Sequence, residues 1–481
     1  MDSLSRRTFL RNSLIISGST FAITQRGWAA PNQVLRAAVV GMGVRGKQLT
    51  RQLLNVEGVQ ITWFIDADLS RAEAAKRFAP EAQAAQDIRK ALDDKHVDLV
   101  IIASCNHWHC LSAIWACQAG KDVYVEKPLG HNIFEQRRLV EVVEATGRIV
   151  QVGTQQRSDA VQDEIRAFLH EEKGLGEIKY IRANRYGVRK PVNKADGVLK
   201  IPSEIDYDLW CGPAEKRDLR RDRVHYDWHW DWNTGNGEMG NWGVHIIDDV
   251  RNVGFNDTVG MPKRILTGGG RLLWDDGEVA ETPNVHFAYF ETGSVPVLFD
   301  LSNVPLKPGS DAAPAYMGTR SGYTVHCEGG RYSGGRGGGA AYDSEGKRIR
   351  KFNGNGGGGH VENFVEAVRE RKRSILNADV LQGHFSSAWC ELANVGYRVG
   401  SSYGQEDALA VNGANAAWSE LLAEANRRLG PHDLSLTSPG IALSPLLELD
   451  EASERFVGPL AENANQYLLR DYRPGYELPE V

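Results

Sequence analysis

The six residues from Gly41 to Gly46, Gly-Met-Gly-Val-Arg-Gly, have the glycine spacing of a dinucleotide-binding turn. Such a turn presents the backbone at the start of a helix to the phosphates of a nucleotide. Asp66 lies about twenty residues beyond Gly46, where a carboxylate can accept hydrogen bonds from a ribose diol. A carboxylate there would repel a 2'-phosphate, so the pattern predicts NAD, and Arg71 nearby leaves NADP as the less favoured alternative.

Two further polar segments follow predicted strands of the same domain. Ser104-Cys105-Asn106-His107-Trp108-His109-Cys110 comes after an apolar run, and so does Glu126-Lys127-Pro128. Ligands collect beyond the carboxyl ends of parallel strands, so we expect both segments to border the nucleotide. Cysteine and histidine can hold zinc, but ligands crowded into so short a segment could not easily reach one ion together. We therefore predict no metal site.

The elements that must position these residues alternate between strand and helix. An apolar run at 35–40 leads into the glycine turn, residues 47–54 have helical character, and 59–65 form the next strand. This order is the one that a dinucleotide fingerprint requires, and its continuation favours a parallel sheet with helices on both faces. The other predicted strands of this domain are 99–103, 122–125 and 149–152, and its other predicted helices are 87–92, 110–119 and 134–146.

Together with the glycine turn, the run Ala-Gly-Lys-Asp-Val-Tyr-Val-Glu-Lys-Pro-Leu at 119–129 resembles the glucose-fructose oxidoreductase/inositol dehydrogenase/MocA (Gfo/Idh/MocA) family, over most of residues 35–400. The resemblance implies an α/β Rossmann domain followed by an α+β domain with a large open, mainly antiparallel sheet. One face of that sheet would carry the substrate site and the other often an oligomer contact, so a homo-oligomer is expected. The predicted parts are 33–153 (NAD-binding), 154–400 (substrate-binding, with helices at 359–400 returning to the first domain) and 401–481 (an extension for packing or subunit contact).

The resemblance also implies that Lys127 lies beside the nicotinamide and contacts the reacting oxygen, with His245 as its acid-base partner and a cis peptide before Pro128. An ammonium near an oxidised nicotinamide has a lowered pKa, and an imidazole titrates near neutral pH, so both can exchange a proton with a hydroxyl group. Cys105 and Asn241 depart from the family pattern. The first departure leaves the course of the loop around Cys105 open, and the second leaves the route of the proton open. The predicted catalytic residues are Lys127 and His245, and the predicted cofactor-binding residues are Gly41, Gly43, Val44, Arg45, Gly46, Asp66, Ser104, Asn106, His109, Glu126 and Lys127.

The second domain is rich in tryptophan within 225–232 and 240–249. Flat indole rings suit the apolar faces of sugars, and a packed aromatic core is the competing interpretation. Asp248 or Asp249 could orient His245, and residues 155–158 could instead form a structural turn. The predicted substrate-binding residues are Gln156, Arg157, Tyr186, Trp228, Trp230, Asn241, Trp242 and Asp249.

The rest of the second domain is predicted from shorter patterns. Strands are expected at 177–185, 284–291, 295–303 and 323–328, and helices at 360–371, 383–397 and 416–428. The glycine-rich segments 329–339 and 354–359 are expected to be flexible loops.

The first thirty residues have the features of a twin-arginine export signal. Ser5-Arg6-Arg7-Thr8-Phe9-Leu10-Arg11 precedes an apolar stretch too short to span a bilayer, with small residues at Ala29 and Ala30. We expect removal near those alanines, with retention as an uncleaved anchor as the alternative. The predicted partner is the twin-arginine export machinery. The protein is predicted to be periplasmic or otherwise exported.

Composition narrows the class of protein. A chain of 481 residues is expected to form two domains, and its net charge of -6 gives no basic surface for nucleic acid. Six cysteines spread over this length do not form a disulfide scaffold.

These features predict an NAD-dependent oxidoreductase that acts on a secondary hydroxyl group of a carbohydrate or glycoside. Twin-arginine export carries folded cargo, so the cofactor would be tightly bound and restored within the same site. One alternative is a redox-assisted glycosidase that oxidises its substrate transiently before elimination. A remoter alternative is a non-catalytic sugar-binding protein.

Overall fold

The computed structural model describes residues 34–274, 277–404, 406–407 and 415–481. The export signal expected at residues 1–30 lies outside these ranges. Within them, no helix combines the length and the apolar character needed to cross a bilayer.

The first domain is built on a six-stranded parallel sheet with the order β3-β2-β1-β4-β5-β6. Its strands are short apolar runs, and such runs are typical of parallel sheets because both faces are covered. The predicted alternation is therefore confirmed. The strands are β1 (Leu35–Val40), β2 (Val59–Ile65), β3 (Gln83–Ala85), β4 (Leu99–Ile102), β5 (Asp122–Val125) and β6 (Val150–Val152).

Alternate residues of β1 enter two different cores. Ala38 and Val40 pack with residues of α4 and α5 on one face, and Ala37 and Val39 pack with residues of α1 on the other. Helix α9 also joins the second core, so residues beyond 359 do return to the first domain. The helices of this domain are α1 (Val44–Leu54), α2 (Leu69–Ala75), α3 (Arg89–Leu92), α4 (Asn106–Gln118) and α5 (Ile133–Thr146), and the later helix is α9 (His360–Glu370).

The second sheet has eleven strands, in the order β14-β13-β12-β11-β7-β10-β9-β8-β16-β17 with β15 beside β8. Its described pairs are antiparallel except for β7 with β10, so the predicted mainly antiparallel sheet is confirmed. The strands are β7 (Ile178–Tyr186), β8 (Arg264–Gly270), β9 (Val285–Glu291), β10 (Val297–Ser302), β11 (Ser321–Cys327), β12 (Gly330–Gly335), β13 (Gly338–Asp343), β14 (Arg348–Asn353), β15 (Ile441–Leu443), β16 (Leu447–Asp450) and β17 (Arg455–Val457).

The glycine-rich segment 329–339 is not the flexible loop that its composition predicts. It forms most of the β12–β13 hairpin, in which Gly334 pairs with Gly339. A Cβ atom on Gly334 would lie 2.6 Å from the Gly338 carbonyl oxygen, and one on Gly339 would lie 2.6 Å from the Gly334 Cα. Glycine is required here because the two backbones approach closely. The low strand propensity of glycine predicts a loop and does not take such an approach into account.

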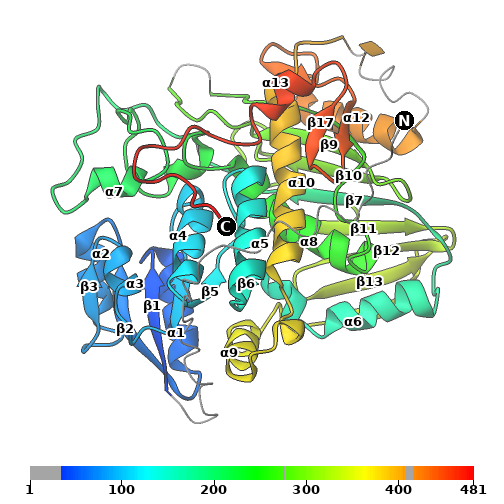
Figure 1. Cartoon of the computed structure of the whole chain (residues 1–481). Helices are drawn as coiled ribbons and strands as arrows, with labels where there is room; N and C mark the ends of the chain where they lie inside the picture. The colour runs from blue at the N-terminus through cyan, green and yellow to red at the C-terminus, as the bar shows by residue number, and fades with distance from the viewer. Residues whose placement is uncertain (1–33, 275–276, 405, 408–414) are drawn as a thin grey trace, which may run out of the picture. The chain divides into compact units, whose positions relative to one another are not determined.

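The helical run at residues 239–254 carries His245 and lies against the second sheet. Its central part is α8 (Val244–Asp249), and a π-helical stretch flanks it on each side, at Met239–Gly243 and Val250–Gly254. Departures of this kind are frequent at functional sites. The long helix α10 (Val380–Val399) packs beside both α8 and α5 and so joins the two domains (Figure 1).

The extension beyond residue 400 is part of the second domain. It supplies β15, β16 and β17, together with α12 (Ala416–Leu429), which packs on the sheet face opposite α8. That face was expected to hold an oligomer contact, and α12 of the same chain covers it over β8, β9 and β10. Helix α13 (Ala461–Asn465) follows β17 and packs beside α10.

The last residues of the chain return to the first domain. The ring of Tyr476 lies 5.6 Å from that of Trp108, and Arg138 donates a hydrogen bond of 3.0 Å to the Pro479 carbonyl oxygen. In the view of Figure 1 the C-terminus accordingly lies beside α4 and α5.

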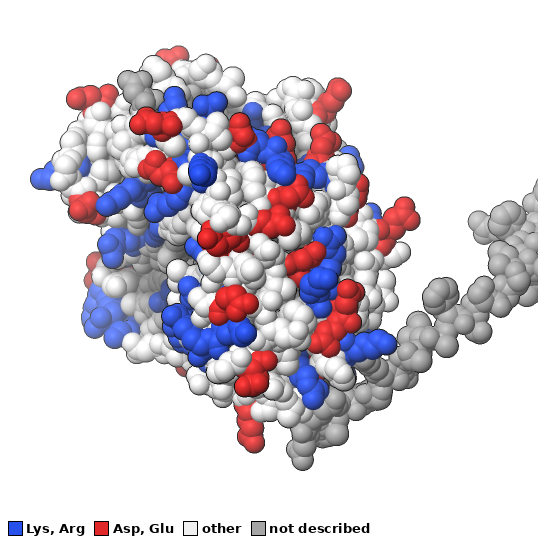
Figure 2. Space-filling view, turned by 90° about the vertical axis from the view of Figure 1, so that its left-hand side faces the viewer, with Lys and Arg blue, Asp and Glu red and all other residues white. Residues whose placement is uncertain are grey.

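Charged side chains are distributed over the surface without a large basic area. Figure 2 shows Lys and Arg gathered beside a hollow at the left of the view, with both signs interspersed elsewhere on that face.

We expect Leu421→Ala to lower the free energy of unfolding by about 2–5 kcal/mol, because Leu421 is fully buried between α12 and the sheet. Leu469→Ala, the same substitution at a side chain that is 41% exposed, should cost less than about 0.5 kcal/mol. Urea denaturation followed by circular dichroism measures both. Equal effects of the two substitutions would show that α12 does not stabilise the sheet.

Candidate active site

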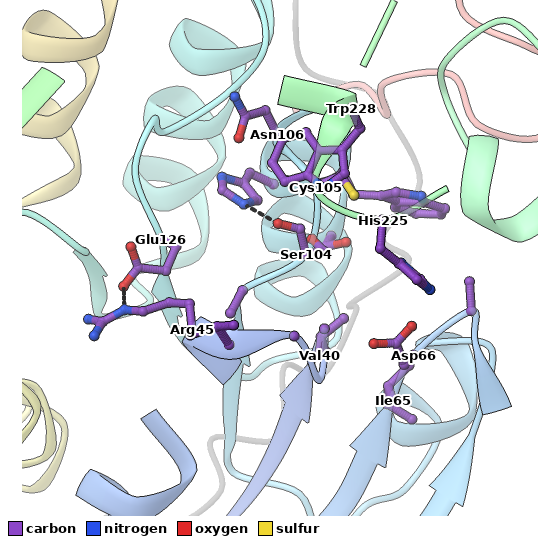
Figure 3. Close-up of a pocket in the computed structure, with 18 of the residues that line it drawn as sticks. Val40, Arg45, Ile65, Asp66, Ser104, Cys105, Asn106, Glu126, His225 and Trp228 are labelled. Atoms are coloured by element: carbon purple, nitrogen blue, oxygen red, sulfur yellow. Dashed lines mark hydrogen bonds and ion pairs between the residues drawn. The ribbon is translucent and has the colours of Figure 1, made fainter. Parts of the chain in front are cut away.

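A cavity of about 840 Å³ lies at the carboxyl ends of β1, β2, β4 and β5. This is the edge of a doubly wound sheet at which ligands collect, next to the point where the strand order reverses between β1 and β4. Residues 209–245 of the second domain contribute to the opposite wall. Figure 3 shows Asp66 and His225 at one side of the cavity and the Arg45–Glu126 pair at the other. The predicted residues that line it are Gly41, Gly43, Val44, Arg45, Asp66, Ser104, Asn106, His109, Glu126, Lys127, Trp228, Asn241 and His245.

The three glycines of the turn serve different purposes. A Cβ atom on Gly41 would lie 2.5 Å from the Ala103 carbonyl oxygen, and one on Gly46 would overlap the Gly41 carbonyl oxygen. Gly46 therefore supports the turn from beneath and does not itself line the cavity. A Cβ on Gly43 would meet only the Arg71 guanidinium, at 3.8 Å. The protein leaves the space above Gly43 open, as a cradle for a pyrophosphate at the start of α1 requires.

Asp66 ends β2 with its carboxylate fixed by backbone donors. Its oxygens accept hydrogen bonds from the Met42 N–H (2.7 Å) and the Asp68 N–H (3.0 Å). Burial raises the pKa of Asp66, and these two donors and Arg71 act against that rise. Arg71 itself lies 3.4 Å from the Asp68 carboxylate. The residues present thus fit an adenine nucleotide whose ribose hydroxyl groups are held by Asp66.

The histidine-rich segment after β4 joins neighbouring parts of the structure. The ring nitrogens of His109 lie 2.7 and 3.1 Å from the carbonyl oxygens of Pro128 and Ser104. Those of His107 lie 3.1 and 3.0 Å from the carbonyl oxygens of Thr234 and Trp210. The two imidazoles therefore face different backbone carbonyls. Across the described ranges, no three histidine, cysteine or acidic side chains are grouped as metal ligands.

Lys127 extends from the end of β5 to the second domain. The peptide bond before Pro128 is cis, as the resemblance implied. The Lys127 ammonium donates to the Asn241 backbone oxygen at 2.6 Å and lies 3.5 Å from the Asn241 side-chain oxygen. Burial lowers the pKa of Lys127. Glu126 is not its partner, because the Glu126 carboxylate accepts from Arg45 at 2.5 Å and from Gln155 at 3.1 Å.

Asn241 connects Lys127 to a buried carboxylate. Its side-chain amide donates to Glu238 at 3.2 Å, and Glu238 also accepts hydrogen bonds of 2.9 Å from Arg185 and from Arg189. The two arginines lower the pKa of Glu238 despite its burial. A buried carboxylate thus lies three residues before Asn241, where two arginines neutralise it.

His245 faces the cavity from α8. Burial and the nearby cations Lys127 and Arg336 hold the pKa of His245 well below its usual value, so the imidazole is neutral at pH 7. Within the described part of the chain, its ring has no hydrogen-bond partner. The ring is therefore free to accept a proton from a ligand.

Neither carboxylate proposed to orient His245 does so. Asp248 accepts two hydrogen bonds from Arg157, at 2.8 and 2.9 Å, and Asp249 accepts from Gln156 and from Gln162. Arg157 also pairs with Asp257. The prediction that Gln156, Arg157 and Asp249 bind substrate is therefore corrected: all three lie in a buried polar network behind His245, as the structural-turn interpretation anticipated.

Three other predicted substrate contacts also lie outside the cavity. Tyr186 is on the α12 face of β7, where its hydroxyl donates to Asp300 at 2.7 Å. Trp230 is buried. Trp242 packs under the Arg185 guanidinium at 4.2 Å. Of the three tryptophans predicted to bind substrate, only Trp228 lines the cavity.

His229 also lines the cavity and was not among the predicted site residues. Its Nδ1 lies 2.5 Å from the Tyr226 carbonyl oxygen and therefore carries the proton, so Nε2 of the neutral ring is an acceptor. Burial lowers the pKa of His229 to about 4, and its ring stacks on Trp228 at 3.6 Å. The prediction for this segment considered only its tryptophans. A histidine between two of them could also have indicated a site residue.

Arg336 is the second residue that was overlooked. It lies at the tip of the β12–β13 hairpin and lines the cavity, with its Nε donating to the Gly356 carbonyl oxygen at 3.2 Å. The glycine-rich sequence around it predicted a loop and gave no indication of this position.

The comparisons with known proteins agree with this architecture. Residues 35–154 match a family model described as an oxidoreductase family with an NAD-binding Rossmann fold, and residues 192–265 match the C-terminal alpha/beta domain of an oxidoreductase family. The inositol 2-dehydrogenases of Salmonella paratyphi B and Paracoccus denitrificans are 37% and 36% identical to this chain over 128 residues. That match covers 26% of this chain and 38% of each relative, so the chain spans well under half of their length.

Among solved structures, the WlbA dehydrogenase from Bordetella pertussis, in complex with NADH and UDP-GlcNAcA, matches with a TM-score of 0.54 at 16% identity. The match covers 74% of this chain and 93% of that structure, and it shows a shared fold.

We expect Gly43→Ala to leave thermal stability unchanged and to weaken NAD binding at least about tenfold, because the added methyl group enters open space above the turn. Gly46→Ala should instead lower the melting temperature, since its methyl group meets backbone. Thermal melts and NAD titrations of both variants test this. Normal NAD affinity in Gly43→Ala would show that no nucleotide approaches this position.

Proposed function

We propose that this chain, in which residues 35–154 and 192–265 match family models of Gfo/Idh/MocA oxidoreductases, oxidises a secondary hydroxyl group of a carbohydrate or glycoside. The observation that carries the proposal is the convergence of Lys127 and the neutral His245 on the cavity that holds Asp66 and the glycine turn. The relatives named inositol 2-dehydrogenase and the WlbA complex with a nucleotide sugar support a polyhydroxylated substrate.

Bound NAD+ would supply the hydride acceptor, so that a C–H hydride and an O–H proton leave the alcohol and a ketone results. The Lys127 ammonium, held by the Asn241 carbonyl oxygen, is placed to donate a hydrogen bond to the substrate oxygen. His245 would take the hydroxyl proton, which requires the neutral imidazole that burial and Lys127 favour. Among the described residues the Lys127 ammonium has no direct carboxylate partner, and its hydrogen bonds go to Asn241, which leaves it available to the substrate.

Trp228 and His229 form the wall from which a sugar would be contacted. The stacked rings present a flat surface on the second-domain side of the cavity. Aromatic faces pack well against the C–H faces of sugars, and the His229 Nε2 can accept from a hydroxyl group.

We further propose that the cofactor is tightly bound and is restored in the same site by a carbonyl acceptor, with the protein working in the periplasm or another exported location. Contacts between the two domains support retention of the nucleotide, because they hold the two walls of the cavity together. Asn106 donates to Asn236 at 2.6 Å, Trp108 donates to the Leu209 carbonyl oxygen at 3.0 Å, and His225 lies 3.0 Å from Asp68. The twin-arginine sequence at residues 5–11 supports the location.

A redox-assisted glycosidase is the second candidate, and the presence of two neutral imidazoles favours it. After oxidation by the route above, a second base would remove the proton from the carbon beside the new carbonyl, and the glycosidic C–O bond would break. His229 offers that base while His245 holds the first proton. Addition of water to the resulting double bond and return of the hydride and proton would leave no net redox change.

The cofactor proposal is tested by denaturing the purified protein and assaying the supernatant for NAD(H) and NADP(H). We expect close to one NAD(H) per chain. A nucleotide-free protein would contradict tight binding. Incubation with glycosides then separates the two candidates, since a keto-sugar with a reduced acceptor indicates the oxidoreductase, and free sugar without net redox change indicates the glycosidase.

We expect Lys127→Met to lower kcat at least about 100-fold and to retain the nucleotide, because it removes only the ammonium that contacts the reacting oxygen. The matched control is Lys263→Met, at an exposed lysine outside the cavity, which should keep wild-type rates. Unchanged turnover in Lys127→Met would remove the lysine from the proposed chemistry.

The pH profile of kcat/KM for alcohol oxidation tests the acid-base roles. The neutral His245 is the active form, and its pKa is lowered, so activity should persist below pH ~6.5 and be lost only as the pH falls through that lowered pKa. Protonated Lys127 is the active form, so activity should decline as the pH rises through a pKa below ~10.4. His245→Asn should remove the acidic limb, and His432→Asn should retain it. An acidic limb that survives in His245→Asn would assign the proton to another group.

A further inference from the structure

A second cavity, of about 310 Å³, lies between α10, residues 232–236 and the segment 466–471 of the C-terminal extension. It is separate from the catalytic cavity. Asn236, in the wall between them, accepts from Asn106 of the first cavity at 2.6 Å and donates to Glu391 of the second at 2.7 Å. None of the proposed catalytic residues lines the second cavity.

Two arginines in its wall lack a carboxylate partner within ion-pair distance among the described residues. The Arg398 guanidinium lies 3.8 Å from the ring centroid of Tyr467 and 5.3 Å from that of Trp232. Arg470 donates to the backbone and side-chain oxygens of Asn233, both at 3.0 Å, and its Nε has no partner. Burial lowers the pKa of both arginines. Arg398 is exposed and Arg470 is partly buried, so two cations without a carboxylate partner among the described residues line the cavity, where an anionic group could pair with them.

The acidic side chains of the cavity do not meet this need. Glu391 is hydrogen-bonded to the side-chain amides of Asn236 and Asn394. Burial raises the pKa of Glu391 to about 8, so it is mostly uncharged at neutral pH. Asp471 is exposed at the mouth of the cavity.

The remaining wall has the character of a site for hydroxyl groups and a sugar ring. Trp232, which the sequence analysis placed among the sugar-contacting tryptophans, lines this cavity and not the catalytic one. Asn394 is 3% exposed, and its side-chain oxygen has no hydrogen-bond partner among the described residues. Gln466 adds an exposed amide at the mouth. An indole face with amides around it suits a ring that carries several hydroxyl groups.

We propose that this second cavity binds a small hydroxylated carboxylate, namely a sugar acid. Arg398 and Arg470 face its carboxylate, Trp232 packs against its C–H face, and Asn394 and Gln466 take its hydroxyl groups. The volume of about 310 Å³ is that of a site for one small ring. Binding here does not depend on turnover in the catalytic cavity.

The test is isothermal titration calorimetry of the full chain with glucuronate, with glucose and acetate as comparators. We expect glucuronate to bind at least about tenfold more tightly than either. Arg398→Met should abolish this preference, and Arg398→Lys, which keeps the charge, should retain part of it. Lys127→Met, in the catalytic cavity, should leave glucuronate affinity unchanged, which separates the two sites.

Two exposed positions give a test that does not disturb packing. Gln466→Glu should weaken glucuronate binding about threefold by repulsion, and Asp471→Asn should strengthen it by a similar factor, with no change for glucose. Equal affinities for glucuronate and glucose, equal affinities for glucuronate and acetate, or no binding at all would overturn the proposal. So would a loss of binding in Lys127→Met but not in Arg398→Met.

Discussion

The hydrogen bond between the Lys127 ammonium and the Asn241 backbone oxygen is the interaction on which the site depends. At 2.6 Å it joins the end of a strand in the first domain to the helical run of the second. Lys127 must remain desolvated and yet without a direct carboxylate partner if its ammonium is to serve a ligand. The structure achieves this by pairing Glu126 with Arg45 and Glu238 with Arg185 and Arg189. The arginines thus neutralise the two carboxylates that would otherwise hold the lysine.

The helical run at residues 239–254 also keeps a reactive side chain free of a carboxylate partner. Among the described residues, the His245 ring has no hydrogen-bond partner, because Asp248 and Asp249, which follow it within one turn, are engaged by Arg157 and Gln156. None of these four network residues lines the cavity. Polar residues near a reactive group can therefore serve to keep other charges away from it, a role that differs from contacting substrate.

The fold was largely predictable because burial on both faces leaves continuous apolar runs in the sequence. Five of the six strands of the first sheet and the helix after the glycine turn follow from such runs, and Lys127 follows from its motif. The edge strand β3 (Gln83–Ala85) was not predicted, because it is short and carries no apolar run. The face on which a side chain lies was harder to predict. In β7, Ile181 and Ala183 enter the core toward α8, and Tyr186 lies on the other face. Both faces of β7 are buried, the second by α12, so the alternation of Ile181, Arg182, Ala183 and Asn184 predicts a strand without marking the face that carries substrate.

Irregular segments explain the other differences. Trp228 and Trp230 occupy a short 3-10 turn, and their spacing does not determine which ring reaches the cavity. The partners of Arg157 lie about ninety to one hundred residues away, a distance over which local pattern carries no information. Arg336 reaches the catalytic cavity only because glycine allows two hairpin strands to approach closely. Each of these placements is determined by tertiary contacts between segments distant in sequence.

The return of the C-terminal segment to the first domain has a consequence for biosynthesis. Tyr476 braces Trp108, which borders the nucleotide cavity, and Arg473 donates to the carbonyl oxygens of Asp208 and Gly212 in the loop opposite. A nascent chain that still lacks residues 466–481 has neither this brace nor the outer wall of the second cavity. The Rossmann sheet, complete by residue 152, can form early on the ribosome, but the enclosed cavity cannot. The contacts that brace the nucleotide cavity therefore form only after residues 473–476 have been synthesised, well after the sheet that the cavity borders.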